Sequence, residues 1–252
     1  AYGLIAGPDA RDPNSQQQPA VSLERWNDPD LRGLTLGIYR PWFSHAAPAV
    51  VAANEAMAAQ FERAGAQVQE IVVPELDAMR LAHIITILSE MAANMRNQGA
   101  EMRRLGPSVQ TTLALTHAFS AYDYIKAQRM RTRALAAFDD IFRRVDVILT
   151  PATAITAPLI PPGGATGPWS DLSADTEVMR FVFPGNLAGL PALSFPVGYD
   201  AEGLPIGMQA MGRHWAEATL LRVAYVAEQH LQRRRPARYY PLLETPAQVV
   251  AE

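Results

Sequence analysis

The chain has 252 residues, of which 49% are hydrophobic and 19% charged, with a formal net charge of −3 at pH 7. This length allows one large α/β domain or two smaller ones, and it can bury a core without a metal or disulfide. The lack of cysteine excludes disulfides, iron–sulfur clusters and a cysteine nucleophile, and the near-neutral charge gives no support for nucleic-acid binding.

The first residues, Ala1–Ala6, have the pattern of the last turn of a helix, and Gly7-Pro8 predicts a turn after it. They lack the basic and apolar regions of a signal peptide. No stretch of the chain approaches the ~20 uninterrupted apolar residues of a bilayer span. A helix tail without a cap at residue 1 favours a chain cut from a longer polypeptide. The sequence leaves open whether the protein is cytoplasmic or membrane-associated.

A strand, a helix and a second strand are predicted next. Leu34–Tyr39 and Val68–Val73 have the composition of short strands. Between them, Pro48 suits the first turn of a helix, whose apolar residues recur every three or four positions as far as Gly65. Strand–helix–strand at this spacing predicts two parallel strands in a buried sheet.

The middle of the chain is predicted to be helical. Leu76–Met95 carries apolar residues at helical spacing, and Ser120 with Asp123 resembles a capping box that begins another helix. That helix has an apolar face and an opposite charged face, which we interpret as solvated or interdomain surface. The charged residues are Lys126, Arg129, Arg133 and Asp140.

Proline and glycine residues divide the segment that follows into separate elements. Val145–Leu149 predicts a strand, and the proline- and glycine-rich Pro158–Pro168 predicts a loop. Val178–Leu187 has a helical pattern, which Pro184 is expected to interrupt.

The last third predicts a hairpin followed by a helix. Ala192–Tyr199 and Ile206–Gly212 are predicted strands, and the short linker Asp200–Gly203 predicts that they are antiparallel neighbours. Trp215–Leu231 is a predicted amphipathic helix, and the basic run Arg233–Arg235 suits its C-terminal end. Together the elements predict an α/β fold with a mixed β-sheet covered by helices.

Metal and phosphate chemistry find no support in the residue spacing. The five histidines form no metal-binding pair, and we interpret each as a surface or capping residue: His45, His83, His117, His214 and His230. Gly163-Gly164 and Gly185 lack the spacing of phosphate-binding loops. We expect no metal and no cofactor.

Nucleophilic catalysis finds no complete set of residues either. Such chemistry needs an activated serine or threonine and a base. Ser194 lies in a predicted strand with no identifiable base, and Lys126, the only lysine, lies on a charged helix face. We therefore interpret Ser194 as a strand serine and Lys126 as a solvated side chain.

Four stretches resemble the C-terminal half of amidase signature enzymes. Val145–Pro151, Asn186–Gly198 and Gly203–Arg213 are similar to three sequence blocks of that family, and Ile5–Pro13 resembles the segment just downstream of its catalytic core. The likeness covers almost the whole chain. It implies that residues 1–252 are the C-terminal portion of a single amidase signature domain, without the N-terminal catalytic portion.

Four other pieces are similar to plant-type fatty acid amide hydrolases and their bacterial relatives. His214 is a minor departure, because that branch commonly has proline there. The pieces are Val72–Leu76 with Met79-Arg80, Phe119–Ile125, Met179–Val182 and Gly212–Thr219.

The resemblance implies hydrolysis of a C–N amide bond by a Ser–cis-Ser–Lys triad, in which lysine acts as base through the bridging serine. In the family all three residues lie upstream of the segment with which this chain begins, so no catalytic residue is assigned here. The implied partners are a small-molecule amide, with lipid-like amides included, and the N-terminal portion of the same enzyme or a second chain. No nucleic-acid partner is implied, and a homo-oligomer is allowed.

The resemblance also implies an acyl-binding wall in the helical middle. The matching hydrophobic positions are Ile87, Leu115 and Phe119. Leu115 and Phe119 are four residues apart, which predicts that they share one helix face. Ordinary helix–helix core packing remains the alternative explanation of these residues.

Three functions therefore stay open. The chain is part of an amide hydrolase, or a catalytically inactive lipid- or amide-binding or scaffold module, or similar to the glutamine-hydrolysing subunit of a tRNA-dependent amidotransferase. In the first case its strands are expected to pair with strands of the missing half, and an unpaired apolar edge would promote association.

Overall fold

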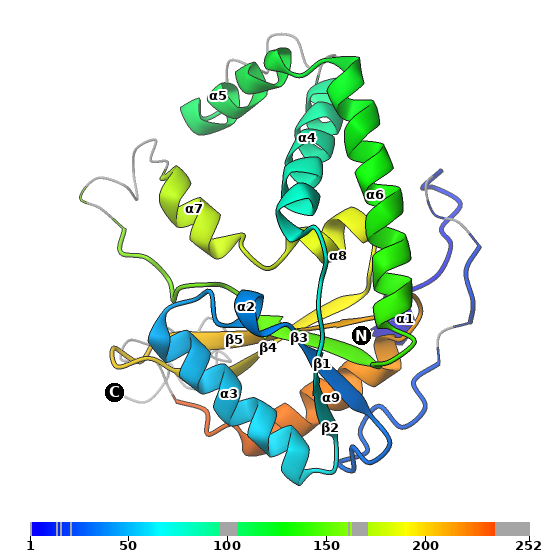
Figure 1. Cartoon of the computed structure of the whole chain (residues 1–252), viewed down its shortest axis with the longest axis vertical. Helices are drawn as coiled ribbons and strands as arrows, with labels where there is room; N and C mark the ends of the chain where they lie inside the picture. Colours follow the sequence, from blue (N-terminus) through cyan, green and yellow to red (C-terminus); the bar gives the residue numbers. More distant parts are fainter. Residues whose placement is uncertain are drawn as a thin grey trace, which may run out of the picture.

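A five-stranded mixed β-sheet between two layers of helices forms the centre of the fold (Figure 1). The computed structural model describes residues 2–13, 15, 17–20, 22–95, 105–160, 162 and 171–234. The predicted α/β fold, with a mixed sheet covered by helices, is confirmed.

The sheet combines a parallel half with an antiparallel half. Its strand order is β2-β1-β3-β5-β4. β1 is parallel to β2 and β3, and β5 is antiparallel to β3 and β4. The strands are β1 (Thr35–Ile38), β2 (Gln67–Glu70), β3 (Val147–Pro151), β4 (Ala192–Tyr199) and β5 (Pro205–Gly212).

The helices lie on both faces of this sheet. α3 and α9 cover one face, and α8 with the antiparallel pair α4 and α6 covers the other (Figure 1). None of the described helices has the length and apolar character that crossing a membrane requires. The helices are α1 (Tyr2–Ile5), α2 (Arg40–Phe43), α3 (Pro48–Arg63), α4 (Leu76–Met95), α5 (Pro107–Leu115), α6 (Ala121–Ile141), α7 (Leu172–Val178), α8 (Phe183–Ala188) and α9 (Glu217–His230).

The predicted parallel unit at the start of the chain is confirmed, with a shorter second strand. α3 buries Met57 and Phe61, and the Phe61 ring meets Phe195 of β4 edge-on at 6.3 Å. β2 ends at Glu70 instead of continuing through the apolar residues after it. Ile71 and Val73 are nevertheless buried, because they pack under α4 and α6 as a loop.

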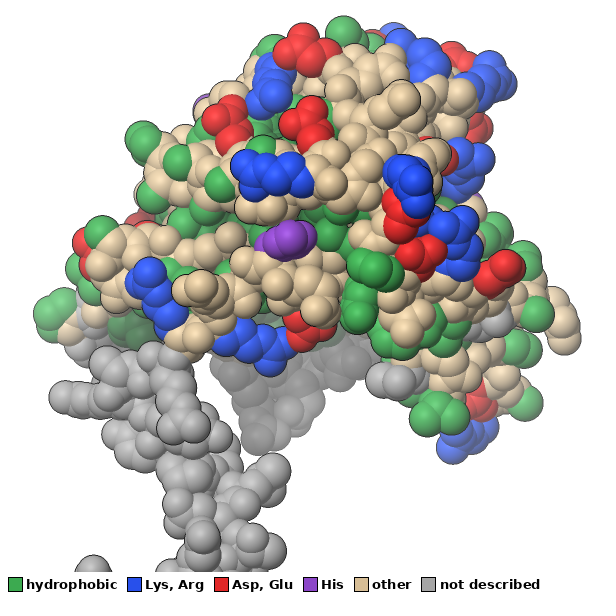
Figure 2. Space-filling model, turned by 90° about the horizontal axis from the view of Figure 1, so that it is seen from below, with side chains coloured by type: hydrophobic (Ala, Val, Ile, Leu, Met, Phe, Trp, Pro, Cys, Tyr) green, Lys and Arg blue, Asp and Glu red, His purple; other side chains and the backbone are tan. Residues whose placement is uncertain are grey.

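On the side of the molecule where α3 and α9 lie, the outer surface carries acidic and basic side chains mixed with each other. On the face drawn in Figure 2, acidic and basic side chains alternate with scattered hydrophobic ones. A surface that binds nucleic acid would instead carry basic residues clustered together. The distribution therefore agrees with the near-neutral composition of the chain.

The amphipathic pattern predicted for α6 is confirmed. Its apolar face is buried against the sheet and α4, whereas Lys126, Arg129, Arg133 and Asp140 are exposed. The predicted capping box is also present, because the Ser120 hydroxyl accepts from the Asp123 N–H and the Asp123 carboxylate accepts from the Ser120 N–H. Hydrogen bonds from Ser120 hold the pKa of Asp123 below its ordinary value.

The single interrupted helix predicted for Val178–Leu187 is wrong. Two helices form instead, because Asp171 caps α7 and Pro184 lies in the first turn of α8. Proline is favoured there, since the first N–H groups of a helix have no partner within it. Phe181 lies between the two helices, fully buried and 5.5 Å from the ring of Trp42.

The C-terminal hairpin and helix are close to the prediction. β4 and β5 are antiparallel, and Gly203 adopts a φ of +83° in the connecting turn. α9 begins at Glu217, two residues later than predicted, because Trp215 has a φ of +67° and ends the preceding turn. Arg235 and most of the predicted loop Pro158–Pro168 lie outside the described residues.

A buried polar contact fixes β5 against β3. Nε2 of Gln209 donates hydrogen bonds to Oγ1 of Thr150 (3.1 Å) and to the carbonyl of Phe181 (3.0 Å). Gln209 and Thr150 are also direct partners in the ladder. Because these donors and acceptors satisfy one another away from water, the contact holds the strand pair and the segment before α8 in one arrangement.

The Ser120 cap generates a prediction on stability. Replacing Ser120 with alanine removes the side-chain acceptor at the start of α6, and we expect the free energy of unfolding to fall by about 1 kcal/mol. Urea unfolding followed by circular dichroism measures the change. Thr132→Ala is the matched control, because Thr132 is exposed within α6 and its hydroxyl donates to the carbonyl of Gln128 in the same helix. Equal stability of the Ser120→Ala variant and the wild type would contradict the role of the cap.

Candidate functional site

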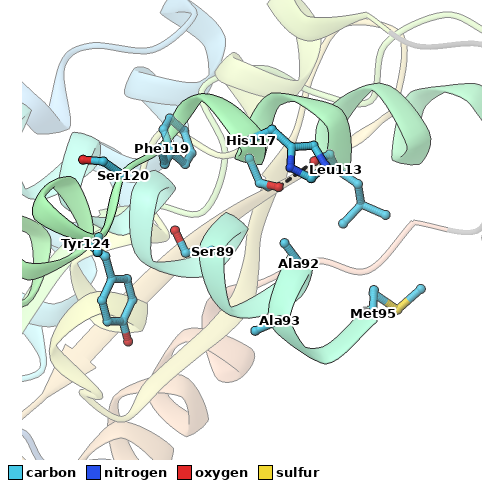
Figure 3. Close-up of a pocket in the computed structure, with 11 residues that line it drawn as sticks. Ser89, Ala92, Ala93, Met95, Leu113, His117, Phe119, Ser120 and Tyr124 are labelled. Atoms are coloured by element: carbon cyan, nitrogen blue, oxygen red, sulfur yellow. Dashed lines mark hydrogen bonds between the residues drawn. The ribbon is translucent and has the colours of Figure 1, made fainter. Parts of the chain in front are cut away.

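A cavity of about 750 Å³ lies where α4, α5 and the start of α6 meet (Figure 3). One wall consists of α4, and the opposite wall is the turn between α5 and α6. The lining residues are Ser89, Ala92, Ala93, Met95, Leu113, Thr116, His117, Phe119, Ser120, Ala121 and Tyr124.

The wall opposite α4 exists because the chain changes conformation twice. α5 ends at Leu115, a single 3₁₀ turn spans Thr116–Ala118, and Phe119 is extended before the Ser120 cap. The buried Thr116 hydroxyl closes this turn by donating to the Leu113 carbonyl at 2.6 Å. The turn therefore presents side chains to the cavity that one continuous helix would place elsewhere.

The α4 wall combines three small side chains with Met95 at its end. Ser89, Ala92 and Ala93 leave space beside the helix that larger residues would fill. Tyr124 of α6 also lines the cavity (Figure 3). Its hydroxyl donates to the Glu90 carboxylate of α4 at 3.0 Å. That hydrogen bond, with some desolvation, raises the pKa of Tyr124.

The chemistry of the cavity suits an uncharged ligand. None of its described lining residues is a carboxylate, lysine or arginine. Apolar walls with a few hydroxyl groups bind apolar or amphiphilic molecules, because the polar groups orient a ligand that apolar burial holds.

The three predicted substrate-contacting residues are not brought together by this cavity. Phe119 lines it, whereas Leu115 and Ile87 lie outside it and are 58% and 46% exposed. The expectation that Leu115 and Phe119 share one helix face is wrong, because the 3₁₀ turn lies between them. Ile87 is two residues from Ser89, or about 200° around an α-helix, so it points to a different side of α4.

The cavity also contains residues that sequence reasoning missed. Ala92 and Ala93 are consecutive small residues near the end of α4, after the large apolar residues Ile84, Ile85, Ile87 and Leu88. That contrast is visible in the sequence and indicates a gap beside the helix. The wall opposite these two alanines is the turn after α5, and residue spacing in the sequence does not predict the course of that turn.

The residues considered for catalysis do not form a serine–lysine pair. Nζ of Lys126 lies 4.5 Å from the centre of the Tyr122 ring, on the exposed face of α6. Ser194 is exposed on β4. Within the described chain, no hydrogen bond joins Lys126 to a serine, and no group of histidine and carboxylate side chains is arranged to hold a metal ion.

The interpretation of His83 as a surface or capping residue is wrong. The side chain lies within α4 and is 7% exposed, whereas the other four histidines are exposed. His83 follows Met79 and Ala82 on the buried side of α4, which explains its position. Desolvation lowers its pKa, because burial penalises the charged imidazolium.

Comparisons with known proteins identify similar sequences. The family model described as Amidase matches residues 1–221. A fatty acid amide hydrolase of Medicago truncatula is 42% identical over 92% of this chain and 39% of its own length. One from Arabidopsis thaliana is 41% identical over 85% of this chain and 36% of its own length. The chain therefore spans about two fifths of these relatives.

Other relatives share the fold at lower identity. A glutamyl-tRNA(Gln) amidotransferase subunit of Halothermothrix orenii is 30% identical over 92% of this chain and 54% of its own length. The corresponding Thermotoga maritima structure has a TM-score of 0.69 at 26% identity, over 88% of this chain and 48% of its own length. A bacterial aryl acylamidase has a TM-score of 0.70 at 20% identity, over 90% of this chain and 49% of its own length, which shows the fold alone.

Burial of His83 generates a prediction on pH. Its folded pKa lies below the ordinary 6.5, so near that pH the unfolded chain binds more protons than the folded chain. Stability should therefore fall as the pH drops from about 7.5 to about 5.5. Urea unfolding across this range should show a flatter pH dependence for His83→Asn. The same slope in His83→Asn and wild type would refute the assignment, and the exposed His214→Asn serves as control.

Proposed function

Because this chain belongs to the amidase family, we propose that it forms part of an enzyme that hydrolyses the C–N bond of fatty acid amides. The observation that carries the proposal is the 42% identity with a plant fatty acid amide hydrolase over 92% of the chain. The uncharged cavity at α4, α5 and α6 supports it, since a fatty acyl chain carries no charge along its length.

The catalytic machinery is proposed to come from the part of the amidase domain that precedes this chain. Its Ser–cis-Ser–Lys triad would be supplied by an N-terminal portion of the same enzyme or by a second polypeptide. Two observations support this division. The chain spans 39% of its Medicago truncatula relative, and its only lysine lies over the Tyr122 ring on an exposed helix face.

The acyl chain of the substrate is proposed to contact Phe119, Leu115 and Ile87. Phe119 would do so inside the cavity, where each buried methylene contributes about 0.8 kcal/mol. Leu115 and Ile87 are exposed in the described chain, so they are accessible to an acyl chain that extends beyond the cavity. Their exposure also speaks against the core-packing explanation for these two residues.

Two alternatives make different predictions. An inactive binding or scaffold module would bind fatty amides without turnover. A protein similar to the glutamine-hydrolysing amidotransferase subunit would favour glutamine, and the lower identity of 30% with such a protein makes this the weaker alternative.

Labelling with a serine-directed fluorophosphonate tests the proposal. Material isolated with this chain from its native source should hydrolyse a long-chain fatty acid primary amide. The label should lie on polypeptide outside residues 1–252, whether continuous with the chain or copurified with it. Mass spectrometry locates the labelled serine.

The matched control is the 252-residue chain expressed alone, which should neither react with the probe nor turn over the amide. Lys126→Arg in the native material should keep full activity, because this lysine is not assigned to the triad. Sustained hydrolysis by the isolated chain would overturn the proposal, and saturable binding without any labelled polypeptide would establish the binding module instead.

Filling the cavity generates a prediction on substrate length. Ala93→Trp replaces a small side chain of the α4 wall with a large one, so long-chain fatty amides should lose cavity contacts. We expect their affinity to fall at least about tenfold, with short-chain amides affected less. Isothermal titration calorimetry with a series of chain lengths measures this. Ala136→Trp, at an exposed position of α6, is the control, and equal losses in both variants would show that the cavity is not the acyl site.

A further inference from the structure

The charged face of α6 borders a groove that is separate from the cavity beside Phe119. α4 and α6 lie side by side (Figure 1), and the groove between them has a volume of about 470 Å³. This volume is within the range of sites that hold one small molecule. Among the described residues, none lines both the groove and the cavity. The groove is lined by Ala78, Leu81, Ala82, Ile85, Asp123, Lys126, Ala127, Arg129, Met130 and Arg133.

The two margins of this groove differ in chemical character. The lining residues of α4 are all apolar and recur at the spacing of one helix face, and Leu81 among them is 59% exposed. The lining residues of α6 include three cations, Lys126, Arg129 and Arg133, at intervals of three and four. An apolar margin that faces a cationic margin complements an amphiphile with an anionic head.

Arg129 is the cation that is available to an anion. The Arg133 guanidinium pairs with the Glu75 carboxylate, and Nζ of Lys126 lies over the Tyr122 ring. Arg129 is exposed, and within the described part of the chain its guanidinium has no hydrogen bond or ion pair. A guanidinium binds a carboxylate through two parallel hydrogen bonds.

Asp123 is the one carboxylate among the described residues that line the groove. It accepts hydrogen bonds from the N–H (2.9 Å) and the hydroxyl (2.6 Å) of Ser120 at the start of α6. Arg129 is six residues further along the helix, or about 9 Å along its axis. An anion bound at Arg129 therefore lies away from the negative charge of Asp123.

We propose that this groove binds the anion of a long-chain fatty acid, with its carboxylate on Arg129 and its chain along Leu81 and Ile85. The inference rests on the proposed function for the origin of this ligand. Hydrolysis of a primary fatty amide breaks the C–N bond. The hydroxyl of water bonds to the carbonyl carbon, and its other hydrogen goes to the nitrogen, which leaves as ammonia.

The charge of the ligand separates the groove from the cavity. A carboxylic acid has a pKa of about 4, so the released fatty acid is an anion at neutral pH, whereas the amide is uncharged. The uncharged cavity suits the amide, and the cationic margin of the groove suits the acid. The groove is thus proposed as a binding site for the product.

Like charge argues against a second copy of the chain as the occupant. Two copies placed groove to groove would bring Lys126, Arg129 and Arg133 of both chains towards each other. Juxtaposed like charges disfavour an interface. A fatty acid anion instead brings the opposite charge.

Titration calorimetry with monomeric dodecanoate tests the proposal on the chain in its native assembly. The titrations use an Ala93→Trp background, which fills the cavity, and are repeated without it. We expect Arg129→Gln to weaken binding at least about threefold, because the carboxylate loses its partner. Arg144→Gln is the matched control, since it removes the same charge from an exposed position after α6. Equal affinity of Arg129→Gln and its parent would overturn the inference.

Two further ligands separate the head from the chain. Hexanoate should bind at least about tenfold more weakly than dodecanoate, because it has six fewer methylene groups to place along α4. Dodecyltrimethylammonium has the same chain with a cationic head, so Arg129→Gln should not weaken its binding. A similar loss for both head groups would show that Arg129 does not recognise the carboxylate.

Vesicles of phosphatidylcholine and phosphatidylserine distinguish a free acid from a membrane surface. We expect Arg129→Gln and its parent to sediment equally with these vesicles. Loss of vesicle binding in Arg129→Gln, with dodecanoate affinity unchanged, would refute the proposal in favour of a membrane contact.

These outcomes also separate the groove from the proposed function. Binding of dodecanoate through Arg129 without any amide hydrolysis would refute the function and leave the groove assignment standing. Amide hydrolysis with dodecanoate binding that is independent of Arg129 would refute the groove assignment alone.

Discussion

Complete burial of β3 is the constraint on which the rest of the structure depends. All five of its residues are buried, so both faces of the sheet must be covered there. α3 and α9 cover one face, and α4, α6 and α8 cover the other. Because the backbone groups of a buried strand need partners within the protein, β3 pairs along its whole length with β5, and Val147 and Ile148 also pair with β1.

Several residues that carry the family resemblance support this strand rather than chemistry. Asp146, just before β3, accepts the N–H of Thr35 at 2.9 Å and lies 3.4 Å from the guanidinium of Arg213 after β5. Gln209 in β5 bonds Thr150 in β3. These residues connect β1, β3 and β5 at both ends of β3. Their structural role explains how the chain can match the amidase family over residues 1–221 although its described residues contain no serine–lysine pair.

The cavity beside Phe119 lies away from this core, where small residues of α4 leave space beside the helix. An acyl chain is proposed to occupy it. The buried His83 is not among its lining residues, because it lies on the core side of α4.

The sequence by itself determined the alternation of strands and helices, the hairpin, the capping box at Ser120 and the family, because these depend on residues close together in the chain. It also placed Phe119 among the binding candidates. Only the tertiary structure decided that His83 is buried, that Pro184 begins a helix, and that Leu115 and Ile87 lie outside the cavity. These outcomes depend on which elements pack against each other, and the packing around β3 combines residues more than a hundred positions apart.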